Sequence, residues 1–136
     1  MKNIFLSIFA LSVLASCGAT TGAAKSKVGT AQVSVVNTQW QLAGYSSKGK
    51  VPTLLIEGGK LSGQAPCNRY FGELMLDATA GNFSASNIGA TRMACENLSE
   101  ESNYFEMLKQ ANKYVVNGNT LELYKNNLLL LKFSKL

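Results

Sequence analysis

The C-terminal part of the chain alternates short apolar runs with asparagine-rich turns, and this pattern narrows the possible folds more than any other. Residues 114–116 and 120–124 flank Asn117-Gly118-Asn119, and Asn126-Asn127 separates the second run from residues 128–133. Asn and Gly tolerate positive φ angles, which favours tight turns between strands. The pattern therefore predicts a three-stranded antiparallel meander.

The last strand of this meander begins with four consecutive leucines, at residues 128–131. A continuous apolar run is typical of a strand buried on both faces, whereas a strand with one wet face alternates apolar and polar residues. We therefore expect this strand to be buried on both faces, or nearly so. On this interpretation, either Leu129→Asp or Leu131→Asp should abolish folding.

Further strands are predicted upstream from alternating apolar residues and turn signals. Trp40 and Leu42 are expected to point inward, and Gly58-Gly59 is expected to turn a hairpin. Ala65-Pro66 interrupts the pattern, because proline cannot donate to a sheet ladder. These predicted strands cover residues 37–42, 53–57, 60–63, 69–76 and 82–88, with a loop at residues 77–81.

One main helix is predicted near residues 98–112. Asn97 can serve as its N-cap, and Glu100 three residues later completes a capping-box pattern. We attribute the acidic residues of this segment to capping and solvation: Glu100, Glu101 and Glu106. Apolar residues at helical spacing form one stripe that we expect to face the core: Tyr104, Phe105, Leu108 and Ala111.

Several strands, one helix and a closing meander, without an internal repeat, place the chain in the α+β class. We expect a single domain over residues 35–136, because a chain of 136 residues supports one modest core. So many strands in a short chain favour a curled antiparallel sheet, arranged around the helix as a partly open barrel.

The N-terminal end has the pattern of a bacterial lipoprotein export signal. Lys2 precedes an apolar run that ends at Leu14-Ala15-Ser16-Cys17, a lipobox with small residues before a cysteine. The run is shorter than the roughly 20 residues that span a bilayer. We therefore expect a signal peptide at residues 1–16 and lipid attached to Cys17. An ordinary signal peptide followed by a chance cysteine is the alternative.

Residues 17–34 contain mainly Gly, Ala, Ser, Thr and Lys, so they cannot bury enough apolar surface to offset the entropy of ordering. We interpret them as a flexible tether between the lipid and the domain. Several acyl chains on Cys17 would hold the protein on a membrane almost permanently. Gly18 replaces the aspartate that favours inner-membrane retention in many lipoproteins, so we expect an outer-membrane location facing the periplasm.

The charge and the residue content argue against several functions. The formal charge is +5, but the lysines are scattered, whereas nucleic-acid binding usually needs a concentrated basic stripe. The chain has no histidine, the commonest general base and a common zinc ligand. Nothing in the spacing of Glu57, Glu73, Asp77 and Glu96 places two carboxyl groups in one site. We therefore expect a monomeric, non-catalytic protein with no cofactor, no metal and no nucleic-acid partner.

Two cysteines, Cys67 and Cys95, remain once Cys17 is assigned to lipid. Outside the cytoplasm such a pair favours a disulfide, which would contribute about 3–4 kcal/mol in the chain-entropy model. Two buried thiols are the alternative. Soft sulfur ligands also suit Cu(I), and Met75 and Met93 could join the cysteines, but the two cysteines do not form a Cys-x-x-Cys pair.

Two motifs give the chain a more specific resemblance: Cys67-Asn68-Arg69-Tyr70-Phe71-Gly72 and Thr91-Arg92-Met93-Ala94-Cys95. With Trp40-Gln41-Leu42 near the start, a helix after the second motif and closing strands, the chain resembles the META domain family of HslJ-like heat-shock lipoproteins. The resemblance covers nearly the whole expected folded region. Gln64-Ala65-Pro66 departs from the family pattern, which often has glycines before the cysteine.

The resemblance implies a small envelope or secreted domain linked with stress and antibiotic tolerance, and it implies neither an enzymatic activity nor a cofactor. It also carries over Cys67 and Cys95 as a candidate disulfide. The remaining motif positions are candidate surface or network residues: Asn68, Arg69, Thr91 and Arg92.

We therefore expect a non-catalytic cell-envelope lipoprotein that acts in stress or antibiotic tolerance by binding an envelope protein or a small ligand. The alternative is a periplasmic inhibitor or ligand-binding lipoprotein, for example one that blocks a cell-wall hydrolase. In that case the loops at residues 45–52 and 77–81 could present the binding edge.

Overall fold

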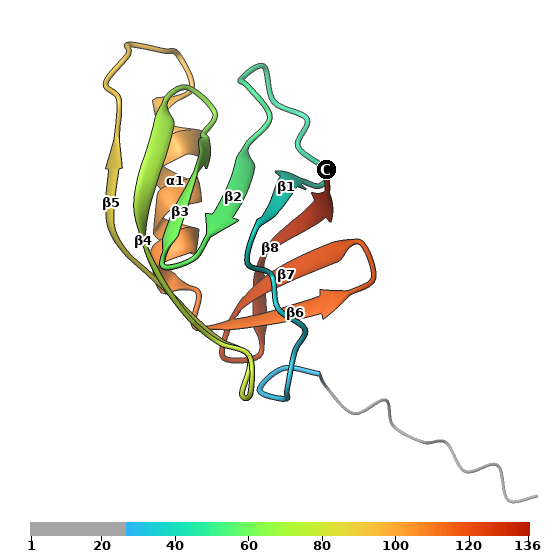
Figure 1. Ribbon diagram of the computed structural model, residues 1–136. Coiled ribbons are helices and arrows are strands. Elements are labelled where there is room, and N and C mark those ends of the chain that lie inside the picture. Colours follow the sequence, from blue (N-terminus) through green and yellow to red (C-terminus); the bar gives the residue numbers. More distant parts are fainter. Residues whose placement is uncertain (1–26) are drawn as a thin grey trace, which may run out of the picture.

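The computed structural model describes residues 27–136 (Figure 1). The expected signal peptide at residues 1–16 and the expected lipidation site Cys17 lie outside these described residues. Within residues 27–136 the chain forms eight strands and one helix. In chain order they are β1 (Thr38–Leu42), β2 (Thr53–Glu57), β3 (Lys60–Gln64), β4 (Arg69–Asp77), β5 (Asn82–Ala90), α1 (Leu98–Gln110), β6 (Lys113–Asn117), β7 (Thr120–Lys125) and β8 (Leu128–Lys135).

The strands form a closed antiparallel barrel in which each strand pairs with its neighbours in sequence. β8 returns to β1, where Phe133 lies opposite Leu42. The junction with the fewest paired residues lies between β5 and β6. Among the described residues, the single pair Asn82–Lys113 joins these two strands. The predicted α+β class with a curled antiparallel sheet is confirmed, and this junction is where the sheet most nearly opens.

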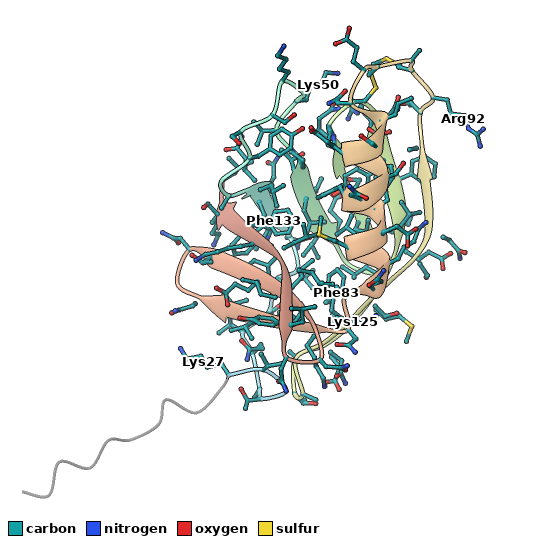
Figure 2. The ribbon with its side chains drawn as sticks, turned by 180° about the vertical axis from the view of Figure 1, so that it is seen from behind. Lys27, Lys50, Phe83, Arg92, Lys125 and Phe133 are labelled. Atoms are coloured by element: carbon teal, nitrogen blue, oxygen red, sulfur yellow. A yellow bond between two sulfur atoms is a disulfide. The ribbon has the colours of Figure 1, made fainter. Side chains whose placement is uncertain are left out.

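The helix α1 fills the space beside the narrow β5–β6 junction. Figure 2 shows it in front, between β5 and β8. Tyr104 and Leu108 are buried in the core and Phe105 packs against it, so the predicted apolar stripe is confirmed. The helix ends at Gln110 rather than at residue 112, because Ala111 has extended dihedral angles. In the described part of the chain, no helix is long and apolar enough to cross a membrane.

The predicted capping box at the start of α1 is wrong. Asn97 occupies the N-cap position, but its side chain makes no capping hydrogen bond. Its Nδ2 instead donates to the carbonyl of Pro66 at 3.2 Å. The Glu100 carboxyl group accepts hydrogen bonds from the hydroxyls of Tyr45 at 2.8 Å and Ser47 at 2.7 Å. Partners from distant loops have therefore replaced local capping.

Alternate residues of the strands supply the barrel core, as expected from the two-residue period of a strand. In β2, Leu54 and Ile56 are fully buried, whereas the residue between them is only partly buried. Trp40 of β1 is buried as predicted, and Leu42 packs partly buried against the core. Phe133 of β8 points into the interior beside the helix (Figure 2).

The expectation that the leucine run is buried on both faces is wrong. Leu131 is 4% exposed, but Leu128 is 64% and Leu129 is 44% exposed. A register shift interrupts the β7–β8 pairing between Leu123 and Tyr124. Because Leu128 and Leu129 lie beyond this shift, at the turn end of the hairpin, they fall outside the barrel interior. The prediction that Leu129→Asp abolishes folding therefore does not hold for this structure, whereas the same prediction for Leu131→Asp does.

The described part of the expected tether, residues 27–34, contacts the barrel. The Gln32 backbone N–H donates to the carbonyl of Ala78 at 2.7 Å, and its side-chain Oε1 accepts from the Val116 N–H at 2.9 Å. The Tyr114 hydroxyl donates to the carbonyl of Val33 at 3.4 Å. This segment is therefore held against the β4–β5 turn and β6.

Candidate functional site

A buried carboxyl group, that of Glu101, anchors the loop between β3 and β4. Glu101 is only 5% exposed, although it lies on a helix whose outer face is wet. Its Oε2 accepts the backbone N–H groups of Cys67 at 2.9 Å and Asn68 at 2.6 Å, and its Oε1 accepts the side-chain amide of Asn68 at 2.7 Å. Hydrogen bonds of this kind offset the cost of removing a carboxyl group from water.

The buried side chain of Asn68 extends this anchor to a second loop. Its Oδ1 accepts the backbone N–H of Met93 at 2.7 Å and the hydroxyl of Thr91 at 3.1 Å. One amide therefore joins the helix, the β3–β4 loop and the segment after β5. Because both ends of this amide are occupied, we assign Asn68 to the positioning of these segments.

The disulfide joins the same two loops: Cys67 and Cys95 are bonded, with their Cα atoms 6.1 Å apart. The sequence left open either a disulfide or two buried thiols, and the structure confirms the disulfide. Cys67 also donates its backbone N–H to Glu101, so the disulfide and the buried carboxyl group hold one loop together.

Reduction of the Cys67–Cys95 disulfide should lower the free energy of unfolding by about 3–4 kcal/mol, since the bond closes a loop with a sequence separation of 28. Thermal unfolding with and without dithiothreitol measures the difference. The double variant Cys67→Ser/Cys95→Ser should match the reduced protein and lose its response to the reductant. An unchanged melting temperature on full reduction would contradict the assignment.

The motif tyrosine, Tyr70, belongs to the core and not to a reactive site. Its hydroxyl donates to the carbonyl of Thr53 at 2.7 Å and lies 2.8 Å from the hydroxyl of Tyr104. Burial raises the pKa of both hydroxyls well above the usual tyrosine value. Phe105 packs edge-on against the ring of Tyr70 at 5.5 Å between centroids. These tyrosines therefore stay protonated and fix the helix to the sheet.

Of the other motif positions, Thr91 joins the network and the two arginines remain on the surface. The Arg69 backbone N–H donates to the Thr91 hydroxyl at 3.1 Å, and the Thr91 N–H donates to the Arg69 carbonyl at 3.0 Å. The side chains of Arg69 and Arg92 are exposed, and neither forms an ion pair with a described residue. Figure 2 shows Arg92 pointing outward from the loop after β5.

A groove of about 680 Å³, which we name the α1–β5 groove, lies between the end of β5 and the first half of α1. Asn68 and Glu101 contribute to its buried side. Met93, 51% exposed, and Leu98, 43% exposed, contribute apolar surface at its rim. The groove is further lined by Ile88, Gly89, Ala90, Thr91, Arg92, Ala94, Ser102 and Phe105.

The backbone of β5 is free along this groove. Because the Thr91 N–H bonds to β4, antiparallel alternation directs the N–H and C=O of Ala90 away from β4. Within residues 27–136 these two groups have no hydrogen-bond partner, since β6 meets β5 at Asn82 alone. A free strand edge beside apolar side chains is the geometry that accepts an added strand.

Neither of the two loops that we considered as an inhibitory edge lines this groove. The loop after β1 lines a smaller hollow of about 320 Å³ with Leu42, Tyr104 and Met107. The β4–β5 turn is held by Asp77, whose carboxyl group accepts the backbone N–H of Thr79 at 2.9 Å. Each loop is therefore fixed by its own contacts.

Acid should destabilise the wild-type domain more steeply than the Glu100→Gln variant. Hydrogen bonds from Ser47 and Tyr45 hold the pKa of Glu100 below its usual value in the folded state. A carboxyl group with a lowered folded pKa stabilises the fold above its unfolded pKa, and this contribution is lost as pH falls through the folded value. Chemical unfolding on both sides of pH 4.5, the ordinary value, measures the difference. Parallel acid profiles for the two proteins would contradict it.

Two of the four candidate carboxyl groups, Glu57 and Glu73, line one hollow of about 390 Å³, where both residues pair with Lys60. Glu73 also accepts a hydrogen bond from Asn87 at 2.9 Å, whereas Asp77 lies at the end of β4 and outside this hollow. Among the described residues, no three or more His, Cys, Asp or Glu side chains are arranged to hold a metal ion.

Sequence reasoning missed Glu101, which we had assigned to capping and solvation. A usable signal was present, because Glu101 precedes Tyr104 by three positions and Leu108 by seven and so lies on the same helical stripe. An acidic residue on a buried stripe requires a partner, and here the partner is the Cys67–Asn68 loop.

The fold and site define a class of small antiparallel barrels, closed beside one helix, in which a buried Asn–Glu pair and a disulfide hold the loops. The chain belongs to the META domain family, whose model matches residues 32–135. An NMR structure of a protein from Burkholderia xenovorans is similar, with 25% sequence identity and a TM-score of 0.62 over 74% of this chain and 83% of that one. A second NMR structure shares 27% identity, with a TM-score of 0.56 over 72% of this chain and 88% of the other. No curated protein matches.

Proposed function

We propose that this META domain is a non-catalytic lipoprotein of the bacterial cell envelope that contributes to stress or antibiotic tolerance by binding another envelope protein. The lipobox at Leu14–Cys17 supports the anchoring, and membership of the META family supports the link with stress. The outer membrane, on the periplasmic side, is the proposed location because Gly18 follows the lipidated cysteine.

The observation that carries the binding role is the free edge of β5 along the α1–β5 groove. The backbone groups of Ala90 could pair with an extended segment of a partner, while Met93 and Leu98 supply apolar contacts. Arg92 adds a cation at the rim, which favours a partner segment that carries a carboxylate near this point. We therefore propose strand addition as the mode of binding.

The polar groups of the same site support binding over catalysis. The carboxyl oxygens of Glu101 and the amide of Asn68 are engaged in holding loops. A general base must instead reach a substrate proton. The site therefore supplies a rigid surface on which a partner strand can be added.

A photo-crosslinking residue in place of Met93, introduced into the anchored protein in living cells, tests this proposal. We expect one envelope protein to be captured from this position and not from Glu73, which lies on β4 outside the groove. Leu98→Asp in the same chain should abolish the capture, because it places a charge on the apolar rim. The purified variant must retain the wild-type melting temperature.

Capture that is equal from both positions, or that survives Leu98→Asp, would contradict binding in the groove. Absence of any captured protein would favour the alternative, a periplasmic inhibitor or ligand-binding lipoprotein. Inhibition of a cell-wall hydrolase by the purified protein would then be the deciding measurement.

A further inference from the structure

One end of the barrel combines exposed leucines with lysines, at the place where the described chain begins. We name it the tether end and define it by residues 27–30, 78–82, 112–113 and 125–129. Figure 2 shows Lys27 and Lys125 toward this end and Lys50 and Arg92 at the opposite one.

Contacts between these segments show that the tether end is one surface. A Cβ added to Gly81 would lie 3.0 Å from the carbonyl oxygen of Thr30, and the Gly81 carbonyl accepts the N–H of Tyr114 at 2.9 Å. The side chain of Asn112 in turn holds the β7–β8 turn, accepting the N–H of Asn126 at 2.8 Å. The start of the described chain therefore adjoins the β4–β5 turn, which bonds to β6, and the residue just before β6 holds the exposed leucine hairpin.

Leu128 and Leu129 supply the apolar part of this surface, and because neighbouring strand residues point to opposite faces, they make the hairpin tip apolar on both faces. They are 64% and 44% exposed, and they form the first two positions of β8 after a turn. Adjacent exposed leucines at the tip of a hairpin are unfavourable in water, since each leaves apolar area hydrated. An apolar environment supplied by a partner would remove this cost.

The lysines beside these leucines keep their charges uncompensated. Lys113 Nζ donates to the side-chain oxygen of Asn82, and Lys125 Nζ donates to that of Gln110 at 3.3 Å, so both partners are neutral. The described ion pairs, Lys109–Glu106 and Lys132–Glu122, do not include them. Asn82 donates in turn to the carboxyl group of Asp77 at 3.4 Å. Lys27, Lys113 and Lys125 therefore form no direct ion pair with a described carboxyl group.

The position of this surface in the chain points to a membrane as its partner. This step rests on the proposed lipidation of Cys17. Ten positions separate Cys17 from Lys27, and a chain of that length spans at most about 34 Å when fully extended. A lipid on Cys17 would therefore keep the tether end, more than any other part of the barrel, close to the bilayer.

We propose that the tether end docks on an anionic lipid surface. Leu128 and Leu129 enter the headgroup region, and Lys27, Lys113 and Lys125 lie near the phosphates. Apolar area and lysine charge act together in binding of this kind. Docking turns the opposite end of the barrel, which carries Arg92 and the loop after β5, away from the bilayer. The rim of the α1–β5 groove is thereby held open to a partner.

The test uses the full acylated protein, reconstituted into vesicles of phosphatidylcholine and phosphatidylglycerol with or without bromine on the acyl chains. Leu128→Trp places an indole at the tether end, and Met93→Trp places one at the opposite end as the matched control. The native Trp40 is buried and contributes an unquenched background. We expect bromolipid to reduce the emission of the introduced indole in Leu128→Trp about twofold and to leave Met93→Trp unchanged.

Two further experiments measure how much the lysine charges contribute to docking. Lys113→Gln/Lys125→Gln on the Leu128→Trp background should abolish most of the quenching, as should replacing phosphatidylglycerol with phosphatidylcholine. The substitutions at Leu128, Lys113 and Lys125 all alter exposed or half-exposed side chains. A melting temperature equal to that of the wild-type protein confirms that each variant is folded. Equal quenching at both indole positions, or none at Leu128→Trp, would overturn the proposal.

Flotation of the same samples separates this inference from the proposed lipid anchor. Protein that floats with vesicles but shows no selective quenching retains its anchor and lacks the docking surface. If the protein fails to float and its intact mass shows an unmodified Cys17, the proposed lipid anchor is refuted. Quenching is then read on that protein mixed with the same vesicles, where selective quenching supports the docking surface and its absence overturns it.

Discussion

The Glu101→Ala variant should be less stable than the wild-type domain by about 3–5 kcal/mol. The substitution leaves the backbone N–H groups of Cys67 and Asn68 and the Asn68 amide without their acceptor in a buried site. Each unsatisfied buried donor costs about 1–3 kcal/mol, and some of this is recovered by water or by rearrangement. The midpoint of urea unfolding measures the change.

Glu106→Ala is the matched control on the same helix. Its side chain is 60% exposed and its carboxyl group pairs with Lys109 at 3.4 Å, so its removal should change stability by less than about 0.5 kcal/mol. Glu101→Gln should fall between the two, because the amide keeps one acceptor oxygen and adds an unwanted donor. If Glu101→Ala and Glu106→Ala unfold at the same urea concentration, the carboxyl group does not anchor the loop.

Leu131→Asp should prevent the domain from folding, whereas Leu129→Asp should not. Leu131 is 4% exposed and pairs with Leu123 of β7 inside the barrel, so an aspartate there would bury a carboxyl group without a partner. The loss of apolar burial and the cost of desolvation together exceed about 4 kcal/mol, a large part of the stability of a small domain. Leu129 is 44% exposed, and a carboxylate there stays hydrated.

Circular dichroism and thermal melting of the two variants check this difference. We expect a cooperative transition near that of wild type for Leu129→Asp and no cooperative transition for Leu131→Asp. Loss of folding in both would show that the leucine run is buried along its whole length, which the exposed fractions contradict. Native-like melting of Leu131→Asp would remove β8 from the core.

Local signals predicted the order and type of the elements. Turn residues located the hairpins, because Gly58, Gly118 and Asn126 all adopt positive φ angles where the sequence predicted turns. The helical stripe at Tyr104 and Leu108 predicted which face of α1 is buried. These features depend on a few neighbouring residues, so the sequence carries them directly.

The features that sequence reasoning missed depend on register and on distant partners. The exposure of Leu128 and Leu129 follows from a register shift against β7, which no property of the leucine run itself reveals. Glu100 and Glu101 are adjacent in sequence and chemically identical, yet the first is only half-buried and the second is buried. The two residues point in different directions from the helix, and only Glu101 faces the Cys67–Asn68 loop. That loop reaches the helix only in the folded chain.

Pairing of the first strand with the last has a consequence for how this protein is made. Lys135 lies opposite Trp40 and Phe133 lies opposite Leu42, so β1 gains one of its two neighbours only when β8 is present. A chain that has been synthesised only as far as β7 has the earlier strands without a closed barrel. Contacts between distant parts of a chain form late and slowly. Closure of the barrel therefore waits for the pairing of β8 with β1, and until then the earlier strands exist as an open sheet with two unpaired edges.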